Sequence, residues 1–269
     1  MMKLYFKVLI LEAKTKMTYR FDFWINSIIS FLVEFFVVWF LWSAIFEQTK
    51  LKQIAGYNLS SIYLYYLGVI LISKIIRAQK STNDVSQDIY QGNLNRYIIF
   101  PVNYISFKYA QYLGKLAPAL IQFFLFGIIA FFIIDKSYEI QISTSSLIMG
   151  ICSIAMANIL YFLIDYLTQL FAFWVSNVWS LDILKWFIAC LLGGYLFPLN
   201  MLPPNVQNII TYLPFKFLFD LPINTLFGKI SFEVWLKEML IGSIWCILLF
   251  LIGQFTWSKG KNLYSGVGI

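Results

Sequence analysis

Two acidic residues lie inside long apolar stretches, where acids are rare: Glu34 within 21–46 and Asp165 within 147–175. A carboxyl group at the centre of a bilayer costs roughly 2.5 to 3.5 kcal/mol, so each side chain is expected to face protein or water. Such an acid can serve a proton relay or contact a transported molecule. It can also form an interhelical hydrogen bond, with the carboxyl protonated because of burial. Neither stretch has a lysine near its centre and the chain has no histidine, so we favour the hydrogen bond.

The other reactive residue types exclude several classes of site. The absence of histidine rules out Ser-His-Asp catalysis and most transition-metal sites. Cys152, Cys190 and Cys246 lie in separate apolar stretches without CxxC spacing, which indicates small hydrophobic side chains rather than ligands. The Gly-Lys pairs lack the glycine spacing of a phosphate-binding loop. We therefore expect that the chain is not an enzyme, binds no cofactor or metal, and leaves any ATP to another chain.

The composition predicts an integral membrane protein. Residues are 60% hydrophobic, 20% aromatic and 12% charged, which leaves too little polar surface for a soluble globule. The apolar runs are continuous rather than alternating, so the elements that cross the membrane are helices. We predict an all-α fold in which 1–269 forms a single transmembrane domain. The six predicted spans are 21–46, 59–77, 106–134, 147–175, 179–200 and 234–256.

The distribution of charge predicts the orientation. The side that carries both termini, the 74–115 link and the 176–185 turn holds most of the 20 lysines and arginines. Loops on the cytoplasmic side of a membrane protein carry an excess of lysine and arginine. We therefore expect the protein to lie in the cytoplasmic membrane, with both termini on the cytoplasmic side. This orientation accounts for the net charge of +7, so we expect no nucleic acid as a partner.

The N-terminal segment 1–20 reads as a helix that lies in the membrane interface. Drawn at 100° per residue, Lys3, Lys7 and Lys14 fall within about 40° of one another, and apolar residues fill the remainder. Such a helix suits the headgroup layer of the lipid. The alternative is a plain cytosolic cap on the first span.

The outer segment 193–229 is apolar but rich in proline, which breaks helices and disfavours helix in the preceding residue. We expect the fifth span to end near Pro198, and short helices such as 204–213 to re-enter the outer leaflet within 201–229. A folded outer lid is the alternative. The prolines of this segment are Pro198, Pro203, Pro204, Pro214 and Pro222.

The order of these features resembles ABC type 2 exporter permeases, and the motifs resemble their daunorubicin-resistance-like branch. The stretch "DIYQGNLNRYIIFPVN", residues 88–103, is similar to a cytosolic element of that branch, although Phe100 stands where the branch often has arginine. The matching residues are Ile89, Gly92, Leu94 and Pro101, then Leu213, Pro214, Phe215, Pro222 and Gly228, and finally Lys259, Gly260, Tyr264 and Gly268.

The resemblance implies that 80–97 is the coupling segment that contacts a cytosolic ABC ATPase dimer, which binds ATP and Mg. Ser81, Thr82 or Asn83 is expected to cap a helix there, and Gly92 to end it. Val85 and Ile89, one helical turn apart, are expected to form an apolar ridge that enters a groove on the ATPase. The residues expected to couple the two proteins are Val85, Ile89, Tyr90, Gly92 and Leu94.

The resemblance also implies a prokaryotic protein that pairs with a second permease, identical or homologous, and lies in membrane lipid. The expected function is to export an amphipathic or lipid-like substrate with ATP hydrolysed by the partner. A rival class is a proton-coupled carrier built on Glu34 and Asp165. The lack of a convincing internal repeat in the sequence argues against it. A membrane enzyme acting on lipid is a third class, disfavoured by the scarcity of polar residues in the spans.

Overall fold

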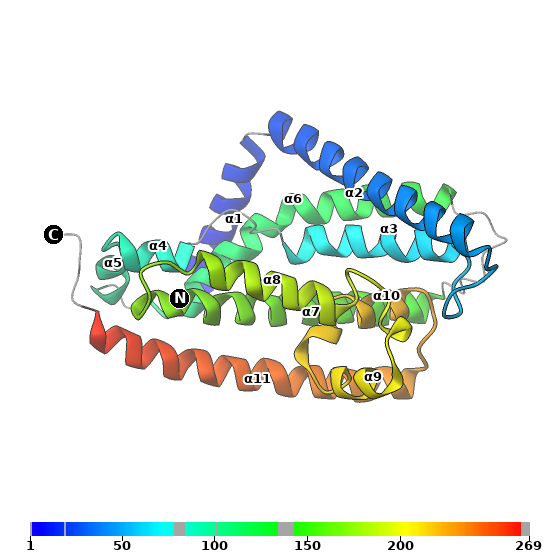
Figure 1. The fold of residues 1–269 in the computed structure, drawn as a ribbon. Coiled ribbons are helices and arrows are strands. Elements are labelled where there is room, and N and C mark those ends of the chain that lie inside the picture. The colour runs from blue at the N-terminus through cyan, green and yellow to red at the C-terminus, as the bar shows by residue number, and fades with distance from the viewer. Residues whose placement is uncertain (1, 19, 78–83, 100–101, 134–142, 265–269) are drawn as a thin grey trace.

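A computed structural model describes the chain except residues 1, 19, 78–83, 100–101, 134–142 and 265–269 (Figure 1). The described residues are mostly helical and contain no strand, which confirms the predicted all-α class. Four helices are long and apolar enough to cross a membrane. They lie in α2 (Arg20–Thr49), α3 (Leu59–Ile76), α7 (Thr144–Leu170, continued by the 3-10 turn η1, Phe171–Phe173) and α11 (Phe232–Leu263).

The two other predicted spans correspond to helices outside that set of four. The stretch 106–134 lies mostly in α6 (Tyr104–Ile133), whose first half carries Lys108 and Lys115. The stretch 179–200 contains α8 (Trp179–Gly193), which at 15 residues spans only about 22 Å.

Local sequence sets where the helices begin and end. The side chain of Asn58 accepts a hydrogen bond from the backbone N–H of Ser61 at the start of α3, and Ser143 and Ser146 form a reciprocal capping box at the start of α7. The expectation that the fifth span ends near Pro198 was wrong. Helix α8 ends at Gly193 because Gly194 takes a left-handed conformation, with φ of 90°.

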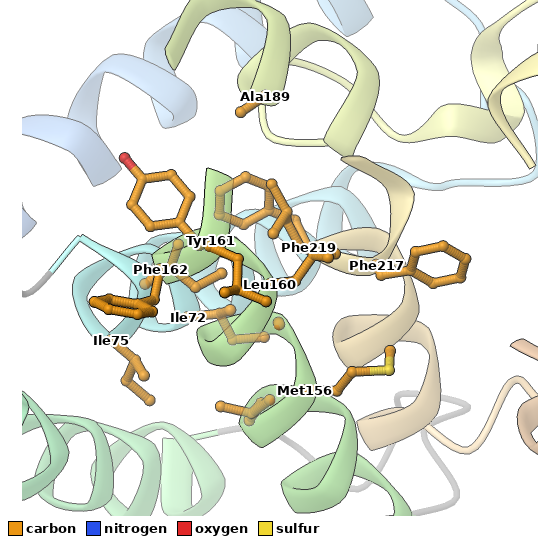
Figure 2. Close-up of a cluster of buried hydrophobic side chains, with 14 of the residues drawn as sticks. Ile72, Ile75, Met156, Leu160, Tyr161, Phe162, Ala189, Phe217 and Phe219 are labelled. Carbon is orange, nitrogen blue, oxygen red and sulfur yellow. The ribbon is translucent and has the colours of Figure 1, made fainter. Parts of the chain in front are cut away.

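The buried core is built around α7. In Figure 2, Leu160 and Phe162 of α7 lie among Ile72 and Ile75 of α3, with Phe219 close by. Leu160, Ile72 and Phe219 are fully buried. The 3-10 turn η3 (Pro214–Phe217) brings part of the outer segment into this core, so residues far apart in the sequence share it.

The N-terminal helix α1 (Met2–Thr18) packs against α6 (Figure 1). A Cβ atom on Gly114 would lie 2.5 Å from the carbonyl oxygen of Leu9, so glycine permits the close approach of the two backbones. Gln111 of α6 also donates a hydrogen bond to Glu12 at 2.8 Å. By contrast, only 6% of the most apolar stretch of α2 is buried, and α2 lies along one edge of the molecule.

The outer segment forms four short elements: η2 (Leu199–Met201), α9 (Pro204–Ile210), η3 and α10 (Asp220–Leu226). Each proline stands at the beginning of one of them, where a missing N–H costs no helical hydrogen bond. Pro198 precedes η2, Pro203 and Pro204 open α9, Pro214 opens η3, and Pro222 lies in the first turn of α10.

Candidate functional site

The predicted coupling segment consists of two short helices, α4 (Asp84–Tyr90) and α5 (Leu94–Ile99), next to the end of α7 (Figure 1). Gly92 separates them with φ of 74°, a left-handed conformation that favours glycine. The capping candidates Ser81, Thr82 and Asn83 lie outside the described residues, as do Phe100, Pro101 and Gly268.

The apolar ridge expected on α4 is not exposed. Val85 and Ile89 are 3% and 6% exposed and belong to the core of the chain, and Leu94 is fully buried. The reason is that α4 packs against α7 and η1, so its apolar side meets the permease itself. The expectation that Val85 and Ile89 insert into a partner is therefore corrected: they hold α4 in place.

A glutamine of α7 caps the beginning of α4. The side-chain oxygen of Gln169, which is buried, accepts a hydrogen bond of 2.9 Å from the N–H of Val85 and one of 3.4 Å from Ser86. The first N–H groups of a helix have no intrahelical partner, and this contact satisfies two of them. The side-chain nitrogen of Gln169 donates to Asp165 at 2.5 Å.

Two buried ion pairs attach α4 to α6. Lys115 pairs with Asp84, and Lys108 pairs with Asp88 at 2.6 Å. Asp88 also accepts a hydrogen bond of 2.9 Å from the hydroxyl of Tyr104. Since both lysines are almost fully buried, these contacts fix the position of α4 relative to α6.

The opposite face of α4 is exposed and polar. Gln87 and Tyr90 of α4, and Gln91 directly after it, are exposed; their spacings of three and four residues place them on one side of the helix. The hydroxyl of Tyr90 donates a hydrogen bond of 2.8 Å to the carbonyl of Val175. Partial desolvation raises the pKa of Tyr90 above its usual value. The three residues are called the α4 face below.

Asp165 lies close to this segment rather than alone within a span. Its carboxylate pairs with Lys185 of α8, which also pairs with Asp182. Through Gln169, Asp165 therefore links the beginning of α4 to α8.

Glu34 also has a lysine partner. Lys74 of α3 pairs with it at 2.7 Å and donates a further hydrogen bond of 2.6 Å to Ser30. The hydroxyl of Tyr195 lies 3.4 Å from the other carboxylate oxygen. The interhelical contact expected for Glu34 is thus an ion pair between α2 and α3. It does not involve the residues that anchor α4.

The short elements of the outer segment border a polar cavity of about 300 Å³, which is lined by residues of α9, α10 and the 55–57 loop. Lys216 pairs with Glu238 at 2.5 Å, and Asn224 donates to Asp220 at 2.9 Å. These polar contacts join the short outer elements to one another and to α11.

Sequence reasoning missed the partners of the acids: Lys74, Lys108, Lys115, Lys185 and Gln169. One signal was present. Asp84 and Asp88 stand one turn apart on a short helix, and Lys108 and Lys115 stand two turns apart on the next long one, so each pair occupies one helix face.

One protein family matches most of the chain. The family described as ABC-2 family transporter protein matches residues 32–268, which include α4, α5, the second part of α2 and the whole of the other three membrane helices. Neither curated proteins nor solved structures give a match. A match over most of the chain, with several apolar helices long enough to span, identifies the protein as a multi-pass membrane protein of the ABC-2 transporter family.

Proposed function

We propose that the chain is the permease subunit of an ABC exporter of the daunorubicin-resistance-like branch. It moves an amphipathic or lipid-like substrate across the cytoplasmic membrane of a prokaryote, and a separate ABC ATPase dimer hydrolyses the ATP. Family membership supports the permease role. The observation that carries the coupling proposal is the construction of α4, whose exposed side is polar and whose buried side is anchored.

The anchors suit a helix that transmits force. The α4 face is exposed, and behind it two ion pairs lead to α6 and Gln169 leads to α7. A displacement of α4 by the ATPase therefore moves α6 and α7 as well. In this proposal Val85, Ile89 and Leu94 support the contact from inside, Gly92 sets the turn, and Tyr90 touches the ATPase.

We infer six crossings, with α6 and α8 added to the four long apolar helices. Helix α6 has 30 residues, about 45 Å, which is enough to cross a bilayer. Helix α8 is too short alone, and the outer segment completes its crossing. Both termini, α4 and α5 are then cytoplasmic, and α1 lies at the inner interface.

The depth of the outer segment supports re-entrant helices. A Cβ atom on Gly68 would lie 3.5 Å from the ring of Phe227 and 3.7 Å from Ile223. Gly68 stands nine residues inside α3, about 13 Å from its beginning at Leu59. Helix α10 therefore lies deeper in the membrane than the outer end of α3. At that depth the non-helical backbone on either side of α10 is tolerated only where protein or water covers it.

The poorly buried helix α2 and the exposed face of α8 supply the surface for a second permease subunit, identical or homologous. On α8, Trp179, Ile183 and Phe187 are exposed at intervals of four residues. Exposed apolar and aromatic side chains on two membrane helices can pack against each other, because van der Waals contacts drive helix association in lipid.

Changing Tyr90 to aspartate is expected to weaken the association with the ATPase by about tenfold or more, because tyrosines at interfaces often contribute over 1.4 kcal/mol. The measurement is copurification of the ATPase with tagged permease, together with stimulation of ATPase activity. The control is Tyr212→Asp, which makes the same change at an exposed tyrosine of the outer segment, far from α4 in the sequence. Equal ATPase recovery from both variants would contradict the assignment of the α4 face.

Cysteine labelling tests the orientation. In a chain whose three cysteines are replaced by serine, Lys52→Cys is expected to react with an impermeant maleimide in intact cells. Gln87→Cys is expected to react only after the membrane is opened. Both positions are exposed, so the reagent reports on the side of the membrane rather than on burial. Reaction of Gln87→Cys in intact cells overturns the inferred topology.

A further inference from the structure

We propose that a groove between α6 and α11 binds one anionic phospholipid of the inner leaflet. Two adjoining cavities form this groove, which is called the α6–α11 groove below. The inference requires the membrane orientation proposed above, but it does not depend on ATP coupling or on the exported substrate.

One half of the groove is apolar. A cavity of about 340 Å³ opens between α6 and α11, with α7 as its floor. Its wall consists of hydrophobic and aromatic side chains with few polar atoms, among them Tyr109, Ile159, Phe162, Ile247 and Phe250. Ile159, Ile247 and Phe250 are exposed, so this half is open to the hydrocarbon of the bilayer.

The other half is polar and cationic. A second cavity of about 320 Å³ shares Ile105 with the first and lies nearer the C-terminal end of α11. Asn103, Gln254 and Lys261 provide its polar lining. Lys261 is exposed and forms no ion pair within the described part of the chain, so its ammonium group is open to an anion.

Two further features place a lipid headgroup in this half. The groove reaches the beginning of the 30-residue helix α6, where Asn103 accepts a hydrogen bond from the N–H of Ser106 and the positive dipole end of the helix favours an anion. The rings of Tyr104 and Trp257, which line the polar half, stack with their centroids 4.4 Å apart and suit the interface of the membrane. Aromatic side chains prefer that level of a membrane, between hydrocarbon and headgroups.

The length of the groove matches one lipid. Along α11 the lining residues Ile247, Phe250, Gln254, Trp257 and Lys261 follow one another at three or four residues, so they form one stripe. Fourteen residues separate its ends, about 21 Å. One leaflet with its headgroup layer is about 20 to 22 Å thick. The stripe changes from apolar to cationic in the same direction as a phospholipid changes from acyl chain to phosphate.

The test compares two lipids on the purified full-length chain by native mass spectrometry. Phosphatidylglycerol is expected to bind about fivefold better than phosphatidylcholine with the same acyl chains, as one lysine near the headgroups contributes about that factor. Lys261→Gln is expected to abolish the preference, and Lys261→Arg to retain it. Lys259→Gln is the matched control, because Lys259 is exposed on the same helix but does not line the groove.

A second measurement locates the lipid. Phosphatidylglycerol with a photoreactive group in the middle of its acyl chain is expected to label peptides of α6, α7 and α11 around Tyr109, Phe162 and Phe250. Ile159→Trp, which fills the apolar half, is expected to reduce this labelling severalfold. Equal binding of the two lipids, or equal effects of Lys261→Gln and Lys259→Gln, refutes the proposal. A third outcome also refutes it: Ile159→Trp leaves the lipid labelling unchanged but alters the oligomeric state or the amount of ATPase that copurifies. The groove would then bind a protein and not a lipid.

Discussion

Replacing Lys108 with methionine is expected to lower the Tm of the purified permease by roughly 10 °C and to abolish ATPase-driven export. The substitution leaves the carboxylate of Asp88 buried beside α6 without its cation. Breaking a buried ion pair on one side costs about 3 to 5 kcal/mol, because the remaining charge has lost water and gained no partner. Thermal unfolding in detergent and transport in vesicles with the ATPase measure the two effects.

The double variant Asp88→Leu/Lys108→Met distinguishes anchoring from charge. A buried pair replaced by apolar residues of similar volume is often neutral for stability. The double variant is therefore expected to recover most of the lost Tm, and to recover export to the extent that α4 still docks on α6. If the double variant is as unstable as Lys108→Met, the ion pair is not the anchor that the structure indicates.

Replacing Lys185 with methionine is expected to be comparably damaging, because this lysine holds two acids at once. Asp165 is the more buried of them, and it also orients Gln169, which caps α4. Loss of the ammonium group is expected to cost about 3 to 5 kcal/mol of stability and to loosen the coupling segment at a distance. The measurements are Tm and the stimulation of ATPase activity by the permease.

Asp182→Asn serves as the matched control for Lys185→Met. The side chain of Asp182 is 40% exposed, and exposed ion pairs contribute only about 0 to 1 kcal/mol. The control is therefore expected to change Tm little and to leave ATPase stimulation intact. A loss of stimulation in Asp182→Asn that equals the loss in Lys185→Met argues against Asp165 as the link to α4.

Much of the fold follows directly from the sequence. The continuous apolar stretches are enough to predict membrane helices. In lipid the N–H and C=O groups of the backbone have no water to bond, so they must form hydrogen bonds with one another, as they do in a helix. The clustered prolines of the outer segment predict short elements in place of one straight span. The end of α8 was misplaced because the Gly193-Gly194 pair, which allows a left-handed turn, comes before the more conspicuous Pro198.

The candidate site could be predicted in its position but not in its contacts. Val85 and Ile89 form an apolar face on a polar segment, and such a face fits a groove on the same chain as well as one on a partner. The lysine partners of Glu34 and Asp165 come from other helices, and a single sequence does not specify which helices are neighbours. Only the fold revealed that Gln169 joins Asp165 to α4.

The exposed position of α2 has a consequence for the membrane that surrounds it. Its apolar stretch, Trp24–Thr49, is about 39 Å long, whereas the hydrocarbon of a bilayer is about 30 Å thick. A helix longer than the hydrocarbon accommodates the mismatch by tilting. Only 6% of the most apolar part of α2 is buried within the chain, compared with 56% for α3 and for α7, so tilting α2 costs less packing inside the chain than tilting α3 or α7. A thinner membrane therefore inclines α2 more readily than the helices of the core around α7.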